Sequence, residues 1–292
     1  MHTARLVEKL SHLPRRAVRE SLRYCDLARL WLYNRFGSAQ VTQPGTPVVS
    51  MTTWARRIST AYFAIESIAR GSMRPSRMIL WIDNEALFRD LPVTLRRLQK
   101  RGLEVKACKN YGPHKKYYPY LESEEIFDTP LVTADDDMLY PRFWLKKLVE
   151  ANRKYPENVN CFWGNVMTVG ENCVGRPSEW TQCTSTLPSF RHHAAGVTGV
   201  IYPPPFLSAL KRAGTAFETC CPKADDLWLH VQALRSGYKI RMILPRLPYF
   251  SFLSVPGTHR TGLCIGNVDR DGNNPQVRAT YNEADVQLLR AD

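Results

Sequence analysis

The sequence has no stretch of eighteen consecutive apolar residues, so it offers no candidate for a membrane-spanning helix. Its first residues lack the apolar core of a secretory signal peptide, and we therefore expect a cytoplasmic protein. The eight cysteines include no C-x-x-C pair and no spacing typical of zinc ligands, which argues against a cysteine-based metal site. Reduced thiols are expected, with a bridge between Cys173 and Cys183 as the alternative.

Acidic residues are in the minority. The chain has 27 Asp and Glu against 40 Lys and Arg, which gives a net charge of +13 and a pI near 9.5. Such a balance favours an anionic partner, and it leaves nucleic acid, an acidic membrane surface, and phosphorylated or nucleotide-linked substrates to be distinguished. The 292 residues, 44% of them hydrophobic, contain no internal repeat or low-complexity tract and are typical of a globular protein that folds by itself.

Residues 1–37 form a basic segment in which apolar residues recur at roughly helical spacing, although Pro14 interrupts the period. Two interpretations remain for this extension. It packs on the main domain, which the imperfect period favours, or it lies as an amphipathic helix on an anionic membrane, at the inner face of the plasma membrane. Residues 38–47 contain Gly, Pro, Ser and Thr and predict a linker.

From residue 48 onward, apolar runs of strand length alternate with segments of helical period. This alternation predicts an α/β fold with a Rossmann-like, mixed, mostly parallel sheet flanked by helices. We expect strands at 48–52, 77–83, 103–107, 130–134, 161–167, 199–202 and 239–244, and helices at 61–70, 86–100, 120–127, 143–154, 205–212, 225–236 and 283–290. The expected parts are an extension and linker (1–47), a catalytic domain (48–255, with halves 48–142 and 143–255) and a tail (256–292), mostly loop, that completes the site.

Three consecutive carboxylates, Asp135, Asp136 and Asp137, follow the buried strand expected at 130–134. Ligands of such sheets bind outside the carboxyl ends of the strands. Like charges this close favour a compensating cation, and Mg²⁺ or Mn²⁺ fits because these hard ions take carboxylate, water and phosphate oxygens. If the strand continues, its alternation places Asp135 and Asp137 on one side and Asp136 on the other. The alternative is a helix N-terminus, where acids complement the dipole of the helix that follows.

Further polar groups follow other predicted strands or open a helix. Thr52, Thr53 and Arg57 come after the first strand and offer hydroxyl and guanidinium groups to a base and its phosphates. Asp83 ends the next strand. Further candidate site residues with charged or titratable side chains are Lys115, Lys116, Asp225, Asp226 and His259. Taken alone, the aspartates at 225 and 226 are equally well explained as helix caps, and His259 is better explained as a loop residue than as a ligand.

These motifs, in their order along residues 48–250, resemble the GT-A glycosyltransferases of bacterial polysaccharide synthesis. The resemblance rests on the runs 50–53, 75–81, 116–119, 133–141 and 225–229, with Arg57. It implies a GT-A fold, a nucleotide-sugar donor and a saccharide acceptor, with GDP-mannose the favoured donor. The oligomeric state, the linkage formed and the choice between inversion and retention are not written in the sequence.

The resemblance also implies roles for individual residues. Asp137 would bind the metal, with Asp135 on the metal or the donor ribose, as the D-x-D element. Asp225 or Asp226 would face the acceptor, as general base in an inverting enzyme. His259 would complete the metal coordination. The remaining residues of the implied site would surround the nucleotide-sugar: Thr52, Thr53, Arg57, Asp83, Lys116 and Asp136.

Two other functions compete with this hypothesis. A nucleic-acid-binding protein would explain the net charge, but the basic residues are dispersed and an exposed acidic triplet would repel phosphate. A nucleotidyltransferase also uses acids, metal and a parallel sheet, but the sequence shows no glycine-rich signature loop, and the stretch 194–199 is too irregular for one.

Overall fold

A seven-stranded sheet forms the centre of the computed structural model, which describes residues 20–45, 47–253 and 272–292. The strand order is β11-β6-β10-β4-β1-β2-β3, and only β10 runs antiparallel to its neighbours. This confirms the predicted mixed, mostly parallel sheet. The strands are β1 (Val48–Thr52), β2 (Arg77–Ile82), β3 (Leu103–Ala107), β4 (Leu131–Ala134), β6 (Asn158–Cys161), β10 (Val200–Tyr202) and β11 (Lys239–Met242).

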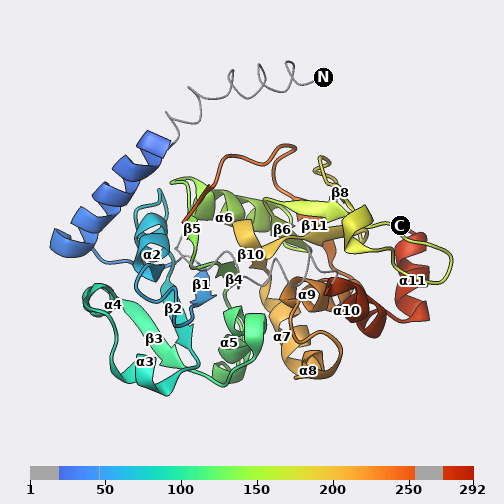
Figure 1. Ribbon diagram of the computed structural model, residues 1–292. Coiled ribbons are helices and arrows are strands. Elements are labelled where there is room, and N and C mark those ends of the chain that lie inside the picture. Colours follow the sequence, from blue (N-terminus) through green and yellow to red (C-terminus); the bar gives the residue numbers. More distant parts are fainter. Residues whose placement is uncertain (1–19, 46, 254–271) are drawn as a thin grey trace, which may run out of the picture.

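Helices cover both faces of the sheet, with α2 and α6 above it and α5, α7 and α9 below it in Figure 1. Central strands are therefore buried on both sides, which explains why β1 and β4 are apolar along most of their length instead of alternating. The helices are α2 (Ala61–Ala69), α3 (Glu85–Arg89), α4 (Val93–Gln99), α5 (Tyr118–Ser123), α6 (Trp144–Lys154), α7 (Pro204–Ala213), α8 (Phe217–Cys220), α9 (Asp225–Arg235), α10 (Asn273–Thr280) and α11 (Glu283–Arg290).

Several predicted elements differ from those observed. The helix expected at 86–100 is two short helices: α3 ends at Arg89 with Asp90 as its C-cap, and Pro92, which disfavours a continuous helix, is the N-cap residue of α4. The strand expected at 161–167 is also divided: after β6, β7 (Gly164–Val166) joins a separate small sheet with β8 (Thr181–Gln182) and β9 (His192–Ala194). Helix α10 lies in the tail that was expected to be mostly loop, and the predicted last helix is α11.

Residues 20–36 form a helix that packs on the domain through part of its surface (blue in Figure 1). Leu30 is buried in a small apolar cluster with Leu139 and Leu253. Large apolar side chains on the rest of this helix are exposed, among them Leu22, Tyr24, Trp31 and Phe36. Packing of the extension is thus observed for these residues, whereas contact with a membrane stays a prediction. No helix in the described ranges is long and apolar enough to cross a membrane.

Residues before β1 form hydrogen bonds to a buried ion pair of the domain, Glu66–Arg101. Glu66 of α2 is fully buried, and both its oxygens bind Arg101, at 2.6 and 3.1 Å. Asn34 donates to the same carboxylate at 3.2 Å and to the carbonyl of Thr94 at 3.0 Å. Arg101 also donates to the carbonyl of Ala39 at 2.7 Å. The chain before β1 is therefore held by bonds that end on a charged pair inside the protein.

Replacing Arg101 by Met is expected to lower the free energy of unfolding by about 3–5 kcal/mol, because it leaves the Glu66 carboxylate buried without its cation. Urea unfolding would measure the loss. Arg96→Ala is the matched control, since Arg96 makes an exposed ion pair with Asp90 and should cost at most about 1 kcal/mol. Equal losses in the two variants would contradict a stabilising role for the buried pair.

Candidate active site

The acidic triplet lies in a turn between β4 and the short strand β5 (Met138–Leu139). Helix α6 begins only at Trp144, after β5, so the triplet does not cap a helix. The turn also replaces the strand alternation that we expected. Asp136 and Asp137 both bind Arg57, whereas Asp135 faces a different cation.

Residues after β1 bind the second and third carboxylates. Thr53 donates its hydroxyl hydrogen to Asp136 Oδ2 at 2.6 Å, and Arg57 Nη1 lies 3.1 Å from Asp136 Oδ1 and 2.7 Å from Asp137 Oδ2. Burial raises the pKa of Asp136, although the Arg57 charge opposes the shift. Burial, reinforced by the negative charge of Asp135, raises the pKa of Asp137 to about 6. The turn therefore holds more negative charge than Arg57 balances.

Lys116 links the acidic turn to the second half of the chain. It ends a 3₁₀ turn (Gly112–Lys116), and its Nζ lies 2.7 Å from Asp135 Oδ1 and 3.5 Å from Asp225 Oδ2. Burial alone would lower the pKa of Lys116, but three surrounding carboxylates, those of Asp135, Asp225 and Asp226, hold it well above its ordinary value. Lys116 is thus a charged ammonium shared between two acidic segments, not a solvated surface group.

The aspartates 225 and 226 lie in the first turn of α9, whose N-cap residue is Ala224. They are therefore not the caps that local sequence allowed. Asp226 Oδ2 accepts a hydrogen bond from the Gly196 amide at 3.2 Å. Burial, and then the charge of Asp225, raises the pKa of Asp226 to about 7. Near neutral pH this carboxyl group is close to the midpoint of its titration and suited to accept a proton.

Gly196 leaves just enough room for this carboxylate. A Cβ atom at position 196 would lie 2.7 Å from Asp226 Oδ1. Gly196→Ala is therefore expected to displace Asp226 and to lower the transfer activity that the sequence predicts by about 10–100-fold, since small displacements at a reacting centre carry such penalties. Steady-state kinetics would measure the effect. Gly170→Ala is the control, because the nearest atom to a Cβ there is 3.4 Å away; equal activity in the two variants would contradict the role of the glycine.

The other predicted nucleotide-site residues lie at the same edge of the sheet. Thr52 donates its hydroxyl hydrogen to the carbonyl of Trp81, at the end of β2, at 3.0 Å. Asp83, just after β2, makes an ion pair with Lys115 at 2.6 Å. His259 lies outside the described residues, so its part in the site stays a prediction.

The carboxylates of Asp135 and Asp137 are the first candidates for the ligands of a metal ion. Within the described ranges, no three His, Cys, Asp or Glu side chains are arranged to hold a metal ion. Two carboxylates nevertheless fit a hard divalent cation, because Mg²⁺ commonly takes only one or two from a protein and completes its shell with phosphate and water. The raised pKa of Asp137, beside Asp135, also fits a place where further positive charge would be favourable.

Sequence reasoning did not assign a site role to Tyr140, and it did not predict the contact between Gly196 and Asp226. The Tyr140 hydroxyl accepts a hydrogen bond from the Asp135 amide at 2.7 Å and lies 3.4 Å from the carbonyl of Val197, to which it donates. It thereby ties the acidic turn to the loop before β10. The only available signals were the position of Tyr140 three residues after the triplet and the glycines around position 196, neither of which specifies a long-range contact.

No protein-family model matches the sequence, and no curated protein matches it. Among solved structures, the fold is similar to residues 1–349 of S. aureus TarS, with 16% identity over 84% of this chain and 69% of that chain and a TM-score of 0.49. It is also similar to a CMP:2-keto-3-deoxy-manno-octonic acid synthetase in complex with CTP, with 9% identity over 68% of this chain and 88% of that chain and a TM-score of 0.42. With these TM-scores and sequence identities, neither likeness identifies the activity of this chain.

Proposed function

We propose that this protein is a metal-dependent glycosyltransferase that moves a hexose from a nucleotide-sugar to a saccharide acceptor in polysaccharide or glycoconjugate synthesis. One observation carries the proposal. Acids from the β4–β5 turn and from the start of α9 meet around Lys116. A group of this kind, at the carboxyl ends of the central strands, supplies both charge stabilisation and a base.

The donor would bind on the side of β1 and β2. Transfer breaks the bond between the anomeric carbon and the diphosphate oxygen, so negative charge develops on the diphosphate. In the proposed reaction, Arg57 and Lys116 stabilise that charge, and Asp135 and Asp137 would hold a divalent cation. Bound Mg²⁺ or Mn²⁺ would supply further positive charge at the diphosphate. Thr52, Thr53 and Asp83 are the proposed contacts to the nucleoside.

The acceptor would bind on the side of α9. Its hydroxyl group is a weak nucleophile until a base removes the proton, and Asp226, with a pKa of about 7, is the proposed base. The proton passes to Asp226 as the acceptor oxygen bonds to the anomeric carbon, which corresponds to inversion. Asp225 is a positioning residue in this scheme, because its carboxylate lies near Lys116.

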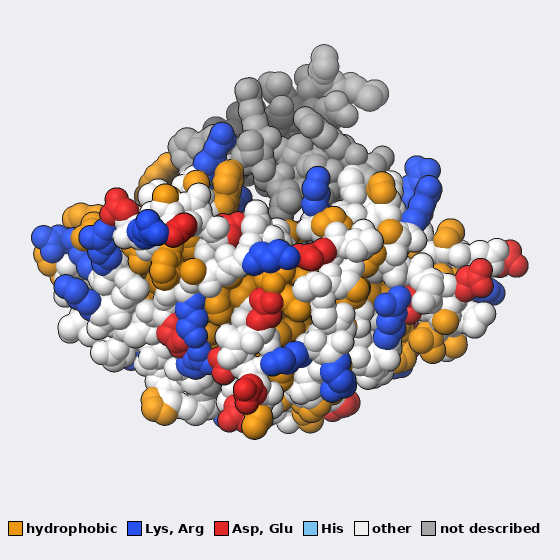
Figure 2. Space-filling model, turned by 90° about the horizontal axis from the view of Figure 1, so that it is seen from below, with side chains coloured by type: hydrophobic (Ala, Val, Ile, Leu, Met, Phe, Trp, Pro, Cys, Tyr) orange, Lys and Arg blue, Asp and Glu red, His pale blue; other side chains and the backbone are white. Residues whose placement is uncertain are grey.

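Nucleic-acid binding is the weaker explanation of the net charge. Several cations are paired with acids inside the protein, including Arg57, Arg101, Lys115 and Lys116. On the face shown in Figure 2, Lys and Arg side chains are interspersed with Asp and Glu. A duplex is bound by a continuous basic surface, which this face lacks.

Thermal unfolding with UDP, GDP, ADP, CMP and CTP, each with and without Mn²⁺, and separately with an oligonucleotide, tests the proposal. A ligand that binds only the folded protein stabilises it, by about 2.7 kcal/mol at a hundred times its Kd. We expect one nucleoside diphosphate to raise the melting temperature only when Mn²⁺ is present, and GDP is the favoured one. A response to an oligonucleotide alone would contradict the proposal, and a response to CTP without any diphosphate would favour a nucleotidyltransferase.

A further inference from the structure

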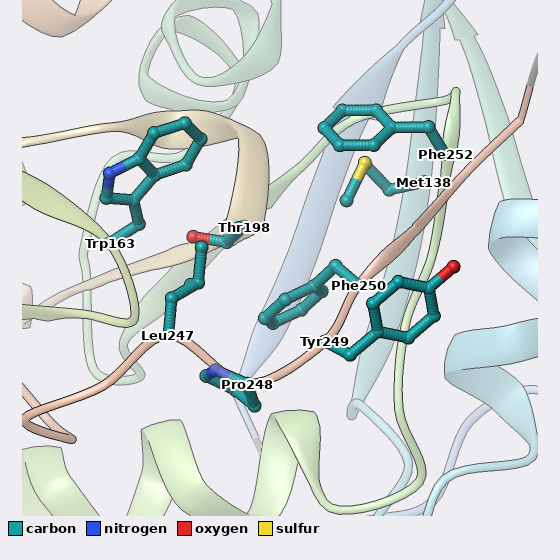
Figure 3. Close-up of a pocket in the computed structure, with 8 residues that line it drawn as sticks. All are labelled: Met138, Trp163, Thr198, Leu247, Pro248, Tyr249, Phe250 and Phe252. Carbon is teal, nitrogen blue, oxygen red and sulfur yellow. The ribbon is translucent and has the colours of Figure 1, made fainter. Parts of the chain in front are cut away.

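A cavity of about 340 Å³ lies between β5 and the segment that follows β11. In Figure 3, Trp163 and Leu247 stand on one side of it and Met138, Phe250 and Phe252 on the other. We call this space the aromatic pocket. Its size is in the range of small-molecule sites, and apolar side chains form most of its wall.

Two segments that line the aromatic pocket continue into the acidic site. Met138 directly follows Asp137, and the Asp137 carbonyl accepts a hydrogen bond from the Leu253 amide at 2.7 Å. Thr198, on the opposite wall, lies two residues after Gly196, whose amide binds Asp226. The Trp163 carbonyl also accepts a hydrogen bond from the Ala195 amide at 2.9 Å, so the lining segments are joined to the backbone that carries Asp137 and to the backbone that binds Asp226.

The pocket belongs to the half of the sheet that does not carry the proposed nucleotide site. Trp163 follows β6, Thr198 precedes β10 and Leu247 follows β11, and these strands lie on the far side of β4 from β1 and β2. A molecule in the pocket would thus approach the acids from the acceptor side.

The lining favours hydrocarbon over sugar. Each buried hydroxyl group of a sugar ring needs a hydrogen-bond partner, and a site that leaves such groups unpaired loses affinity. Beside its aliphatic and aromatic surface, the lining carries three side-chain polar groups, the hydroxyls of Thr198 and Tyr249 and the indole N–H of Trp163, and those of Thr198 and Trp163 are buried. Apolar surface of this kind binds a hydrocarbon chain by removing it from water.

The mouth of the pocket continues onto apolar surface. Phe252 is 54% exposed, and its carbonyl accepts a hydrogen bond from Arg23, in the helix at residues 20–36, at 3.4 Å. Leu22 and Tyr24 flank that arginine in sequence and are 60% and 62% exposed. Phe252 thus presents an exposed apolar side chain at the pocket, beside this helix.

We propose that the aromatic pocket binds a hydrocarbon aglycone of the acceptor, so that the substrate is an amphiphilic glycoside with its sugar at Asp226. This inference rests on the proposed function, because that function assigns the acceptor to the α9 side. The hydrocarbon chain of the substrate holds the acceptor by apolar contact, and the reacting hydroxyl group reaches Asp226 from the edge of the pocket.

Calorimetric titration of the full chain with n-octyl β-D-glucopyranoside, below its micelle-forming concentration, and with the methyl glycoside tests the inference. Burying one methylene group is worth about a fourfold change in Kd, so the octyl glycoside should bind at least about tenfold more tightly. Phe252→Ala and Leu247→Ala should each reduce that preference by about three- to tenfold. Leu187→Ala is the control, because Leu187 is 74% exposed and does not line the pocket.

The same proteins are then tested for the melting shift caused by nucleoside diphosphate with Mn²⁺, which the two pocket variants should retain. Equal affinity for the two glycosides, undetectable octyl binding, or full octyl preference in both pocket variants would overturn the inference, even if the nucleotide shift is present. Retained octyl preference without any nucleotide shift would instead overturn the proposed function.

Discussion

Asp226→Asn is expected to lower sugar transfer by about a thousandfold while raising the stability of the protein at about pH 8. The loss of turnover follows from removing the base, because positioned general bases contribute roughly 10²–10⁴-fold. The amide oxygen of Asn can still accept the hydrogen bond from Gly196, so the local fold should persist. In the unaltered protein, the proposed transfer activity should rise with pH through about 7, as Asp226 loses its proton.

The gain in stability follows from the raised pKa of Asp226. The ordinary pKa of this carboxyl group is 3.8, and in the folded protein the pKa is about 7, so folding favours the protonated form. The contribution of the Asp226 carboxyl group to stability is fully present below pH 3.8 and is lost as the pH rises through about 7. Asn carries no charge and avoids this loss, which we place on the order of 2 kcal/mol for a partly exposed group.

Melting temperatures of both proteins between about pH 4 and about pH 9 would test this prediction. The difference should grow up to about pH 7 and then remain constant. Asp90→Asn, at a largely exposed carboxylate, should show no such dependence. Full transfer activity in Asp226→Asn would refute its role as base, and a pH-independent difference in melting temperature would refute the raised pKa.

Asp137→Ala is expected to abolish transfer, by at least about a thousandfold, and to remove the effect of Mn²⁺ on nucleotide binding. The variant keeps Asp135 alone of the two proposed metal ligands, and a hard cation held by one carboxylate is bound far more weakly. Activity assays and the melting shift with nucleoside diphosphate, each with and without Mn²⁺, would measure the two effects.

The fold of this variant should be intact. Arg57 retains Asp136 at 3.1 Å, and burial already disfavours the charged form of Asp137, so its loss removes an unfavourable charge. Glu125→Ala, at an exposed acid close to β4 in the sequence, is the control and should behave as the unaltered protein. Full activity in Asp137→Ala would refute the proposed metal site.

The apolar runs made the sheet predictable, since strands buried on both faces, such as β1 and β4, leave a clear pattern. The acids were noticed for a similar reason, because three adjacent carboxylates after an apolar run are unusual. The contact between Lys116 and Asp225 could not be predicted in this way. It depends on the packing of segments that are far apart in the chain, and no local pattern records which cation faces which acid. Pro92 indicated a break, but the helical period of the residues around it led to the prediction of one continuous helix at 86–100.

The bonds around Glu66 and Arg101 also bear on where the folding unit begins. Val41 is fully buried, and its amide donates to the carbonyl of Arg101 at 2.8 Å. The segment before β1 thus contributes core surface and helps to satisfy a buried charge. Cooperative unfolding should include this segment together with α2 and α4. A shortened protein that starts at Val48 would retain the whole central sheet and the Glu66–Arg101 pair, but it would lose the hydrogen bonds that Asn34, Ala39 and Val41 make there.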